Sequence, residues 1–283
     1  MKLNINKKGQ AKLIPGYIVI LIWVIFTFML IGWVVFASFS TSLEIFSDEM
    51  FEFATGFHFE NYVKAWNTQK VSVFFMNSLL YTTVSCFCVI MLSAPAAYVL
   101  SRFKFKGNAI IQNLIVSAMG IPVIMIVMPL FGLVTKLKLS NNRFLIMYLY
   151  VAITLPFTIF FLLSFFKSLS STYEEAAYID GCSPMRTFWQ IMLPLVQPGI
   201  ITVTIFNFIT IWNEYFMSLI FANKPKVRPV AVGLFNMIQS MRYTGDWGGM
   251  FASVVIVFLP TFVLYIFLSK RIIQGVTSGA IKG

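Results

Sequence analysis

The sequence predicts an all-α, polytopic membrane protein with six transmembrane helices and both termini in the cytoplasm. Two observations lead to this class. Of the 283 residues, 59% are hydrophobic and only 11% are charged, whereas a soluble domain averages about 25% charged residues. The apolar residues also gather in runs of roughly 20 or more, the length that a helix needs to cross about 30 Å of hydrocarbon. The bilayer is therefore the expected solvent for most of the chain.

Six apolar runs are long enough to span a membrane. A lipid-facing strand would alternate apolar and polar residues, and these runs do not, so helices are expected in all of them. The expected spans cover residues 15–37, 71–100, 110–134, 144–166, 199–222 and 250–269. Several runs contain proline. A proline can produce a kink or allow a segment to move, but proline is also more frequent in membrane helices than in soluble ones.

The basic residues between the runs indicate an orientation. Four lysines precede the first run, which is too long for a signal-peptide core. With both termini inside, the cytoplasmic segments hold the larger share of the 21 Lys and Arg residues, and the first external loop is rich in acidic residues. Lys136, Lys138 and Arg143 then face outward, against this rule.

This topology divides the chain into three parts. They are a cytoplasmic N-terminus (1–14), a six-helix domain (15–269) and a cytoplasmic tail (270–283). The six-helix domain includes an external loop (38–70) and a long cytoplasmic loop (167–198).

Composition and motifs exclude several functions. The net charge of +11 does not indicate nucleic acid, because the basic residues lie in short segments that meet lipid headgroups. His58 is the only histidine and the three cysteines lack metal-ligand spacing, so no metal site is expected. No nucleophile, base and orienting group can be assembled, and no Gly-x-x-x-x-Gly-Lys-Ser/Thr sequence could hold ATP. We therefore expect a non-enzyme that binds no cofactor itself.

The long cytoplasmic loop begins with a signature of a short helix. Ser171 with Glu174, or Thr172 with Glu175, has the spacing of a capping box at a helix start. Gly181 offers the left-handed residue that ends helices. The sequence thus predicts a helix of about two turns in this loop.

A second helix is predicted directly afterwards. Ser183 is its candidate N-cap, Pro184 takes the first helical position, and the helix runs to Pro194. Small Ala176 and Ala177 on the first helix would let it sit deep in a groove of another protein. From spacing alone, a docking element and a plain linker whose residues only cap and end helices remain equally open.

Seven residues of the loop have a fixed spacing: Glu175, Ala176, Ala177, Gly181, Ile191, Leu193 and Pro194. Their pattern resembles the EAA signature of the permease subunits of bacterial ABC importers, and it agrees at every named position. Cys182 stands where many relatives carry alanine, a small-for-small change. The resemblance implies the type I ABC importer permease fold.

In that family the loop forms a coupling helix that docks in a cleft of the nucleotide-binding subunit. The resemblance therefore implies an ATPase-coupling set made of Glu174, Glu175, Ala176, Ala177, Asp180, Gly181 and Pro194. ATP and Mg²⁺ would be bound by the partner ATPase dimer rather than by this chain.

Other segments resemble the carbohydrate branch of these permeases, the MalG type. They are 77–79, 97–107, 212–215, 246–248 and 274–283. The resemblance covers nearly the whole chain. It implies half of the translocation path for a di- or oligosaccharide, a second, MalF-like permease subunit, an extracellular solute-binding protein and a place in the bacterial cytoplasmic membrane. It also implies that the flexible segment 275–283, with Gly279, Lys282 and Gly283, reaches the ATPase interface.

Four polar residues of the spans are candidates for the pathway or gate. Glu214 lies about two-thirds along the fifth run, where a carboxylate costs roughly 2.5–3.5 kcal/mol, so it should face the protein interior or water. It would act near the outer gate with Asn213 and Tyr215, or else pair with a neighbouring helix for assembly. For Asn77, an interhelical hydrogen bond, worth about 0.6 kcal/mol on average, is favoured over contact with sugar.

Three other functions fit the sequence less well. A self-contained secondary transporter usually has ionisable residues at the membrane midplane and inverted repeats, and this chain offers only Glu214. A membrane enzyme would need a paired acid and base near one interface. Only the carbohydrate-branch segments argue against a permease for another solute delivered by a binding protein, such as an amino acid or phosphate.

Overall fold

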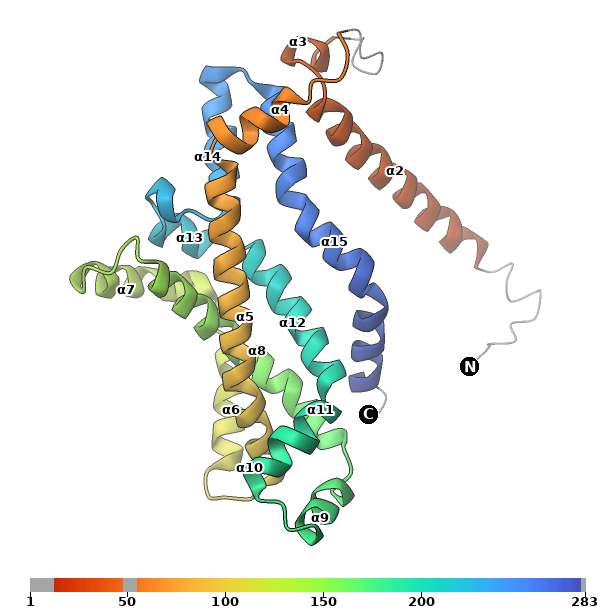
Figure 1. Ribbon diagram of the computed structural model, residues 1–283, viewed down its shortest axis with the longest axis vertical. Helices are drawn as coiled ribbons and strands as arrows, with labels where there is room; N and C mark the ends of the chain where they lie inside the picture. Colours follow the sequence, from red (N-terminus) through yellow and green to blue (C-terminus); the bar gives the residue numbers. More distant parts are fainter. Residues whose placement is uncertain (1–12, 48–54, 281–283) are drawn as a thin grey trace. The chain divides into compact units, whose positions relative to one another are not determined.

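In the computed structural model the chain is built of helices joined by short connections (Figure 1). The structure describes residues 13–47 and 55–280, and these contain no strand. The predicted all-α class is confirmed. Most of the predicted N-terminal segment 1–14, and Lys282 and Gly283 of the tail, lie outside the described residues. The chain divides into two compact units, one of residues 1–70 and 236–258 and the other of residues 71–235 and 259–283.

The first unit begins with α2 (Ile14–Ser38), the first predicted span. Proline is in the first turn of this helix, where its missing N–H is not needed. The most apolar part of α2 buries none of its side chains, as expected of a helix surrounded by lipid or another subunit. Three short elements follow: α3 (Ser42–Ile45), α4 (Glu60–Val63) and the π-helical turn η1 (Lys64–Thr68).

Side-chain amides hold the first unit together across long sequence separations. Asn61 Nδ2 donates to the carbonyls of Ser38 (3.1 Å) and Ser40 (3.0 Å). Gln69 Nε2 donates to Asp246 Oδ2 at 2.8 Å. These bonds fasten the loop after α2 to the turn that precedes the last helix.

Glu44 of α3 is buried and accepts four hydrogen bonds from two threonines. The donors are the N–H and hydroxyl of Thr41 (2.8 and 3.0 Å) and the N–H and hydroxyl of Thr55 (3.0 and 2.7 Å). The hydrogen bond from the Thr55 hydroxyl is the largest cause that lowers the pKa of the Glu44 carboxyl from 4.5 to about 2.

This loop is expected to lose stability in acid. Because the pKa of Glu44 is lower in the folded state, the carboxylate stabilises the loop above about pH 4.5, and this contribution fades as the pH falls toward about 2. Amide hydrogen exchange at Thr41 and Thr55 should show protection factors that fall over this range. Glu44→Gln should lower the protection factors and make them independent of pH there. A wild-type protection that stays constant would contradict the prediction.

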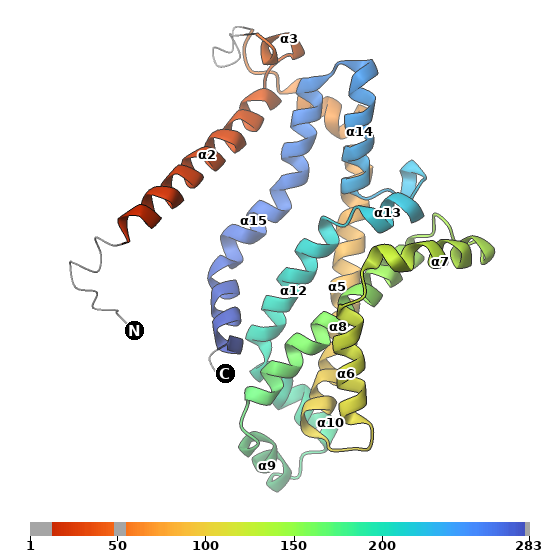
Figure 2. The same cartoon turned by 180° about the vertical axis from the view of Figure 1, so that it is seen from behind.

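The core of the second unit lies between three helices, α5 (Val71–Arg102), α8 (Arg143–Ser168) and α12 (Gln197–Trp212). Both views show α5 and α8 side by side (Figures 1 and 2). Small, buried Ala94 and Ala97 of α5 allow this close approach. The predicted second and fourth spans are thus single helices.

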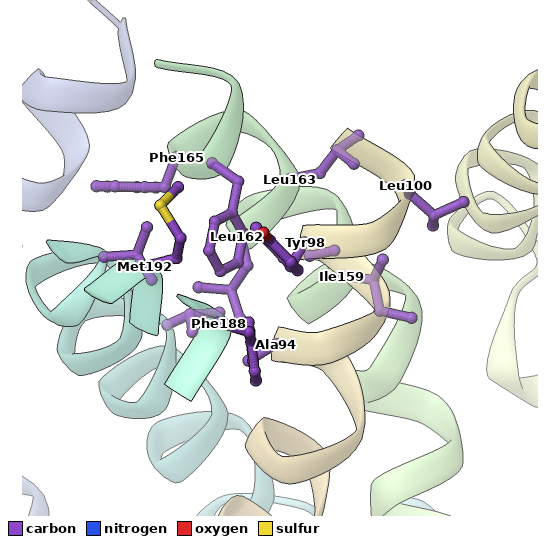
Figure 3. Close-up of a cluster of buried hydrophobic side chains, with 13 residues drawn as sticks. Ala94, Tyr98, Leu100, Ile159, Leu162, Leu163, Phe165, Phe188 and Met192 are labelled. Atoms are coloured by element: carbon purple, nitrogen blue, oxygen red, sulfur yellow. The ribbon is translucent and has the colours of Figure 1, made fainter. Parts of the chain in front are cut away.

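One end of this core is a cluster of aromatic and aliphatic side chains (Figure 3). Tyr98 of α5 lies with its ring centroid 5.1 Å from that of Phe188 and 5.5 Å from that of Phe166. Leu162 and Met192 are fully buried beside them. Residues from α5, α8 and the cytoplasmic loop of the prediction therefore share one packed core.

The third predicted span is not one straight helix. It consists of α6 (Asn108–Met119) and α7 (Val123–Lys136), which meet at 94°. Pro122 has extended backbone angles, and a proline lacks the N–H that a continuing helix needs. The change of direction is plain in Figure 2. The predicted span over 110–134 is therefore present as a pair of helices bent at Pro122.

The fifth predicted span is also broken. Helix α12 ends at Trp212, and the short helix α13 (Phe216–Phe221) starts only after three non-helical residues. Before α12 the chain bends by 72°. The described residues contain up to six candidate spans if two bent pairs each count as one span. These pairs are α6 with α7, and residues 184–195 with α12.

The last elements are η3 (Pro225–Val227), α14 (Val230–Thr244) and α15 (Trp247–Ala280). Helix α15 contains the sixth predicted span and continues to Ala280, so it includes most of the segment 275–283 that was predicted to be flexible. Gly275 and Gly279 lie within it. A glycine costs about 1 kcal/mol relative to alanine inside a helix, which does not by itself end one.

Candidate functional site

The first candidate site is the helix α9 (Thr172–Ile179), whose start differs from the prediction. Ser171 precedes the helix, but its side chain caps nothing, and only its carbonyl accepts the N–H groups of Glu174 and Glu175 (both 3.0 Å). The predicted capping boxes are therefore absent. The Oγ of Ser170 accepts the N–H of Thr172 instead (3.3 Å).

The end of α9 follows the prediction. Gly181 has a φ of +74°, the left-handed conformation that favours glycine. Its N–H donates to Tyr178 O (3.0 Å), and the N–H of Cys182 donates to Ala177 O (2.9 Å). This pair of bonds is a Schellman motif, which satisfies the last carbonyls of the helix and turns the chain sharply.

The second predicted helix starts where expected. Ser183 Oγ accepts the N–H of Arg186 (3.4 Å), and Pro184 takes the first turn of α10 (Pro184–Thr187). The path continues through the π-helical turn η2 (Phe188–Met192) and α11 (Leu193–Leu195), so Pro194 does not end it. The cytoplasmic loop thus forms an elbow of two helical arms, α9 and the segment from α10 to α11.

Helix α9 has a buried side and an open side. Ala177 is buried at 2% exposure, while Glu175, Ala176 and Asp180 are exposed. Tyr178 and Ile179 are open to the surroundings at 82% and 84%. Two large apolar side chains beside two carboxylates are typical of a surface that another protein covers.

An arginine at the end of α5 holds α9 in place. Arg102 Nη2 donates to Leu169 O (2.9 Å), and Arg102 Nε lies 3.1 Å from Glu174 Oε1. The two side chains are only 16% and 20% exposed, and neither of these two atoms has an aligned hydrogen bond among the described residues. The link is therefore an electrostatic one between α5 and the first turn of α9.

The second candidate site surrounds the break before α13. Glu214 Oε1 accepts the N–H of Met217 (2.7 Å), while its Oε2 accepts the N–H (3.1 Å) and the hydroxyl (2.9 Å) of Ser218. Ser218 is in turn hydrogen-bonded to Tyr150 of α8. The carboxylate thus caps α13 and links it through Ser218 to a core helix.

Asn77 fastens a loop. Its Nδ2 donates to the carbonyls of Lys226 (3.0 Å) and Arg228 (2.9 Å). Tyr81 of the same helix donates to Val227 O (2.9 Å). Asn77 also lines a groove of about 400 Å³ beside Arg143. Asn77 thus makes structural hydrogen bonds from α5 to another element, with backbone carbonyls around η3 as its partners, and it also borders an open groove.

Comparison with known proteins identifies the family of this chain. Residues 89–277 match the family described as binding-protein-dependent transport system inner membrane component. The chain belongs to this family. It is a transport subunit and a multi-pass protein of the cytoplasmic membrane.

Two relatives of this permease illustrate the range of the family. The permease is 33% identical to the diacetylchitobiose uptake system permease protein NgcG of Streptomyces coelicolor, over 94% of this chain and 88% of that protein. It is 31% identical to the trehalose/maltose transport system permease protein MalG of Thermococcus litoralis, over 96% of each.

A crystal structure supports the fold of the permease. It is described as that of a bacterial ABC transporter involved in the import of the acidic polysaccharide alginate. The TM-score is 0.81 at 21% identity, over 94% of this chain and 98% of that chain. The predicted all-α permease fold is confirmed, while the cytoplasmic placement of both termini stays a prediction.

The permease brings some predicted residues together and separates others. Glu174 is drawn to Arg102, whereas Glu175 stays on the surface. Asn213 is exposed, with its amide donating to Ile209 O (2.8 Å). The sequence analysis assigns no role to Arg102, and its partner Glu174 lies 72 residues further along the chain, so no local signal marks the pair.

Proposed function

We propose that this permease forms half of the translocation path for a di- or oligosaccharide in an ABC importer. Two relatives are named for the uptake of diacetylchitobiose and of trehalose and maltose, and each aligns over nearly the whole chain. The family name supports delivery of the solute by a separate binding protein.

Helix α9 docks on a partner ATPase, which binds ATP and Mg²⁺. The observation that carries this proposal is the open side of α9, where Tyr178 and Ile179 are more than four-fifths exposed beside Glu175. Helix-in-groove recognition uses such short apolar anchors. The Schellman turn and the Arg102–Glu174 pair hold α9 at its two ends, so a movement of the ATPase would be passed to α5 and α8.

The complete importer contains an ATPase dimer, a second, MalF-like permease subunit and an extracellular solute-binding protein. Both termini of the permease are cytoplasmic in this proposal, which places α9 on the side where ATP is available. The tail residues Gly279, Lys282 and Gly283 reach toward the ATPase interface.

The pathway or gate is proposed at Asn77, Asn213, Glu214 and Tyr215. The groove beside Asn77 and the exposure of Asn213 support this assignment. Glu214 and Tyr215 stand at the break between α12 and α13, where a small change of backbone angles would move α13.

The experiment is Glu175→Ala in the reconstituted importer. We expect ATP-driven uptake of labelled di- and oligosaccharides to fall at least about tenfold, corresponding to about 1.4 kcal/mol of lost coupling. Glu60→Ala, which removes an exposed carboxylate from the first unit, should leave uptake unchanged. Full uptake by Glu175→Ala would refute the docking role, and uptake of amino acids but no sugar would refute the substrate class.

A further inference from the structure

An apolar groove lies between the end of α7 and the start of α8. Its volume is about 340 Å³, and leucine and valine side chains form most of its wall. They are Leu130, Leu133, Val134, Leu137, Leu139, Leu145 and Leu149. No role in coupling or in the proposed pathway uses this groove.

Two exposed lysines stand at its edge. Lys136 is the last residue of α7, and Lys138 follows Leu137, which lines the groove between them. Lys138 has a φ of +56°, so the chain reverses there and runs back toward α8. Arg143, the exposed first residue of α8, adds a third cation.

A second basic segment is tied to the first. The N–H of Asn141 donates to Phe221 O (3.0 Å), and the N–H of Lys224 donates to Asn141 Oδ1 (2.7 Å). Arg143 Nη2 donates to Lys226 O at 3.0 Å. Lys224 and Lys226 are both exposed. Five cations therefore lie on two segments, 136–143 and 224–226, that hydrogen bonds hold together.

Among the described residues of the second unit, no acidic side chain forms an ion pair with this cluster. The sequence has no Asp or Glu between positions 61 and 173, and Glu214 is the single one between 181 and 245. The Glu214 carboxylate already accepts three hydrogen bonds at the start of α13. The cations are thus left for an external anion.

We propose that this groove binds an anionic phospholipid, with an acyl chain along the leucines and the phosphate on Lys136 and Lys138. An apolar groove with a cationic edge, in a chain that spans the membrane, matches the two halves of such a lipid. Each basic residue near an anionic headgroup changes affinity by roughly fivefold. The site also accounts for outward-facing cations that the positive-inside rule leaves unexplained.

Native mass spectrometry of the assembled importer tests the site. With phosphatidylglycerol and phosphatidylcholine titrated in parallel, we expect one tightly held phosphatidylglycerol per permease, preferred at least about tenfold. The double variant Lys136→Gln/Lys138→Gln should lose this preference. The matched control Lys104→Gln/Lys106→Gln removes two exposed lysines with the same spacing between α5 and α6 and should keep it.

A second variant tests the groove itself. Leu133→Trp should fill the groove and release the lipid while all the lysines remain. Glycerol phosphate should not displace the lipid, because it lacks an acyl chain. The proposal is overturned if phosphatidylcholine binds as well as phosphatidylglycerol, or if the double lysine variant keeps its preference for phosphatidylglycerol. It is also overturned if glycerol phosphate displaces the lipid, or if Leu137→Cys forms a crosslink to the companion permease.

Discussion

Reversing the charge of Arg102 is expected to lower ATP-driven uptake at least about tenfold, and reversing Glu174 as well is expected to restore most of it. Arg102→Glu places two carboxylates where the ion pair now spans 3.1 Å, in a partly buried setting. Like charges at this distance repel, and α9 would be pushed away from the end of α5. Arg102→Glu/Glu174→Arg recreates the attraction with its direction reversed.

The readout separates coupling from folding. Uptake and ATP hydrolysis are measured on the same reconstituted importer, and we expect hydrolysis to fall less than uptake in Arg102→Glu, because α9 is misplaced rather than lost. Lys104→Glu, an exposed neighbour two residues further on, is the control for a change of charge. If the double variant transports no better than Arg102→Glu, the pair does not position α9.

Glu214→Ala is expected to destabilise the importer and to lower uptake. The substitution removes the acceptor for three donors, the N–H of Met217 and the N–H and hydroxyl of Ser218. Loss of a helix N-cap costs about 0.5–2 kcal/mol, and donors left unpaired away from water add about 1–3 kcal/mol. The melting temperature of the assembled importer should fall by several degrees. Ser218→Ala, which removes the hydroxyl bond to Glu214 and the bond to Tyr150 but leaves both N–H donors paired with Glu214, should have a smaller effect.

Glu214→Gln distinguishes the two roles that the sequence left open. Glutamine retains an acceptor oxygen and the volume but carries no charge. The single acceptor oxygen of glutamine can serve Met217 or Ser218 but not both, so the melting temperature should lie between those of the wild type and Glu214→Ala. A role in assembly predicts that uptake falls no further than this loss of stability explains. A role as a charged gate predicts uptake as low as in Glu214→Ala in spite of the higher melting temperature. If Glu214→Ala leaves both quantities unchanged, the cap has no importance for either role.

Local signals predicted the elbow well where neighbouring backbone atoms decide the structure. Gly181, Ser183 and Pro184 act on N–H and carbonyl groups within a few residues, so their positions in the sequence are enough. The Ser171–Glu174 capping box did not form, and Glu174 lies beside Arg102 instead. Arg102 lies far away in the sequence, and its attraction for Glu174 appears only once α5 and α9 are folded.

The two broken spans show a similar limit. Hydropathy averages over about 20 residues, so Pro122 and the break at 213–215 leave the mean apolar character of their runs unchanged. Pro95 and Pro156, by contrast, remain inside continuous helices. Whether a proline ends a membrane helix depends on whether neighbouring groups satisfy the freed carbonyls, and this is a tertiary property.

The sequence by itself determined the membrane class, the four long spans, and the glycine and proline positions at which the helices of the elbow end and begin. These features depend on composition and on bonds between near neighbours. Only the tertiary structure decided that Glu214 caps α13, that Asn77 holds the backbone around η3, and that Arg102 holds α9. A buried polar side chain among apolar residues needs a hydrogen-bond partner. The sequence around it does not identify that partner, because a helix far away in the chain supplies it.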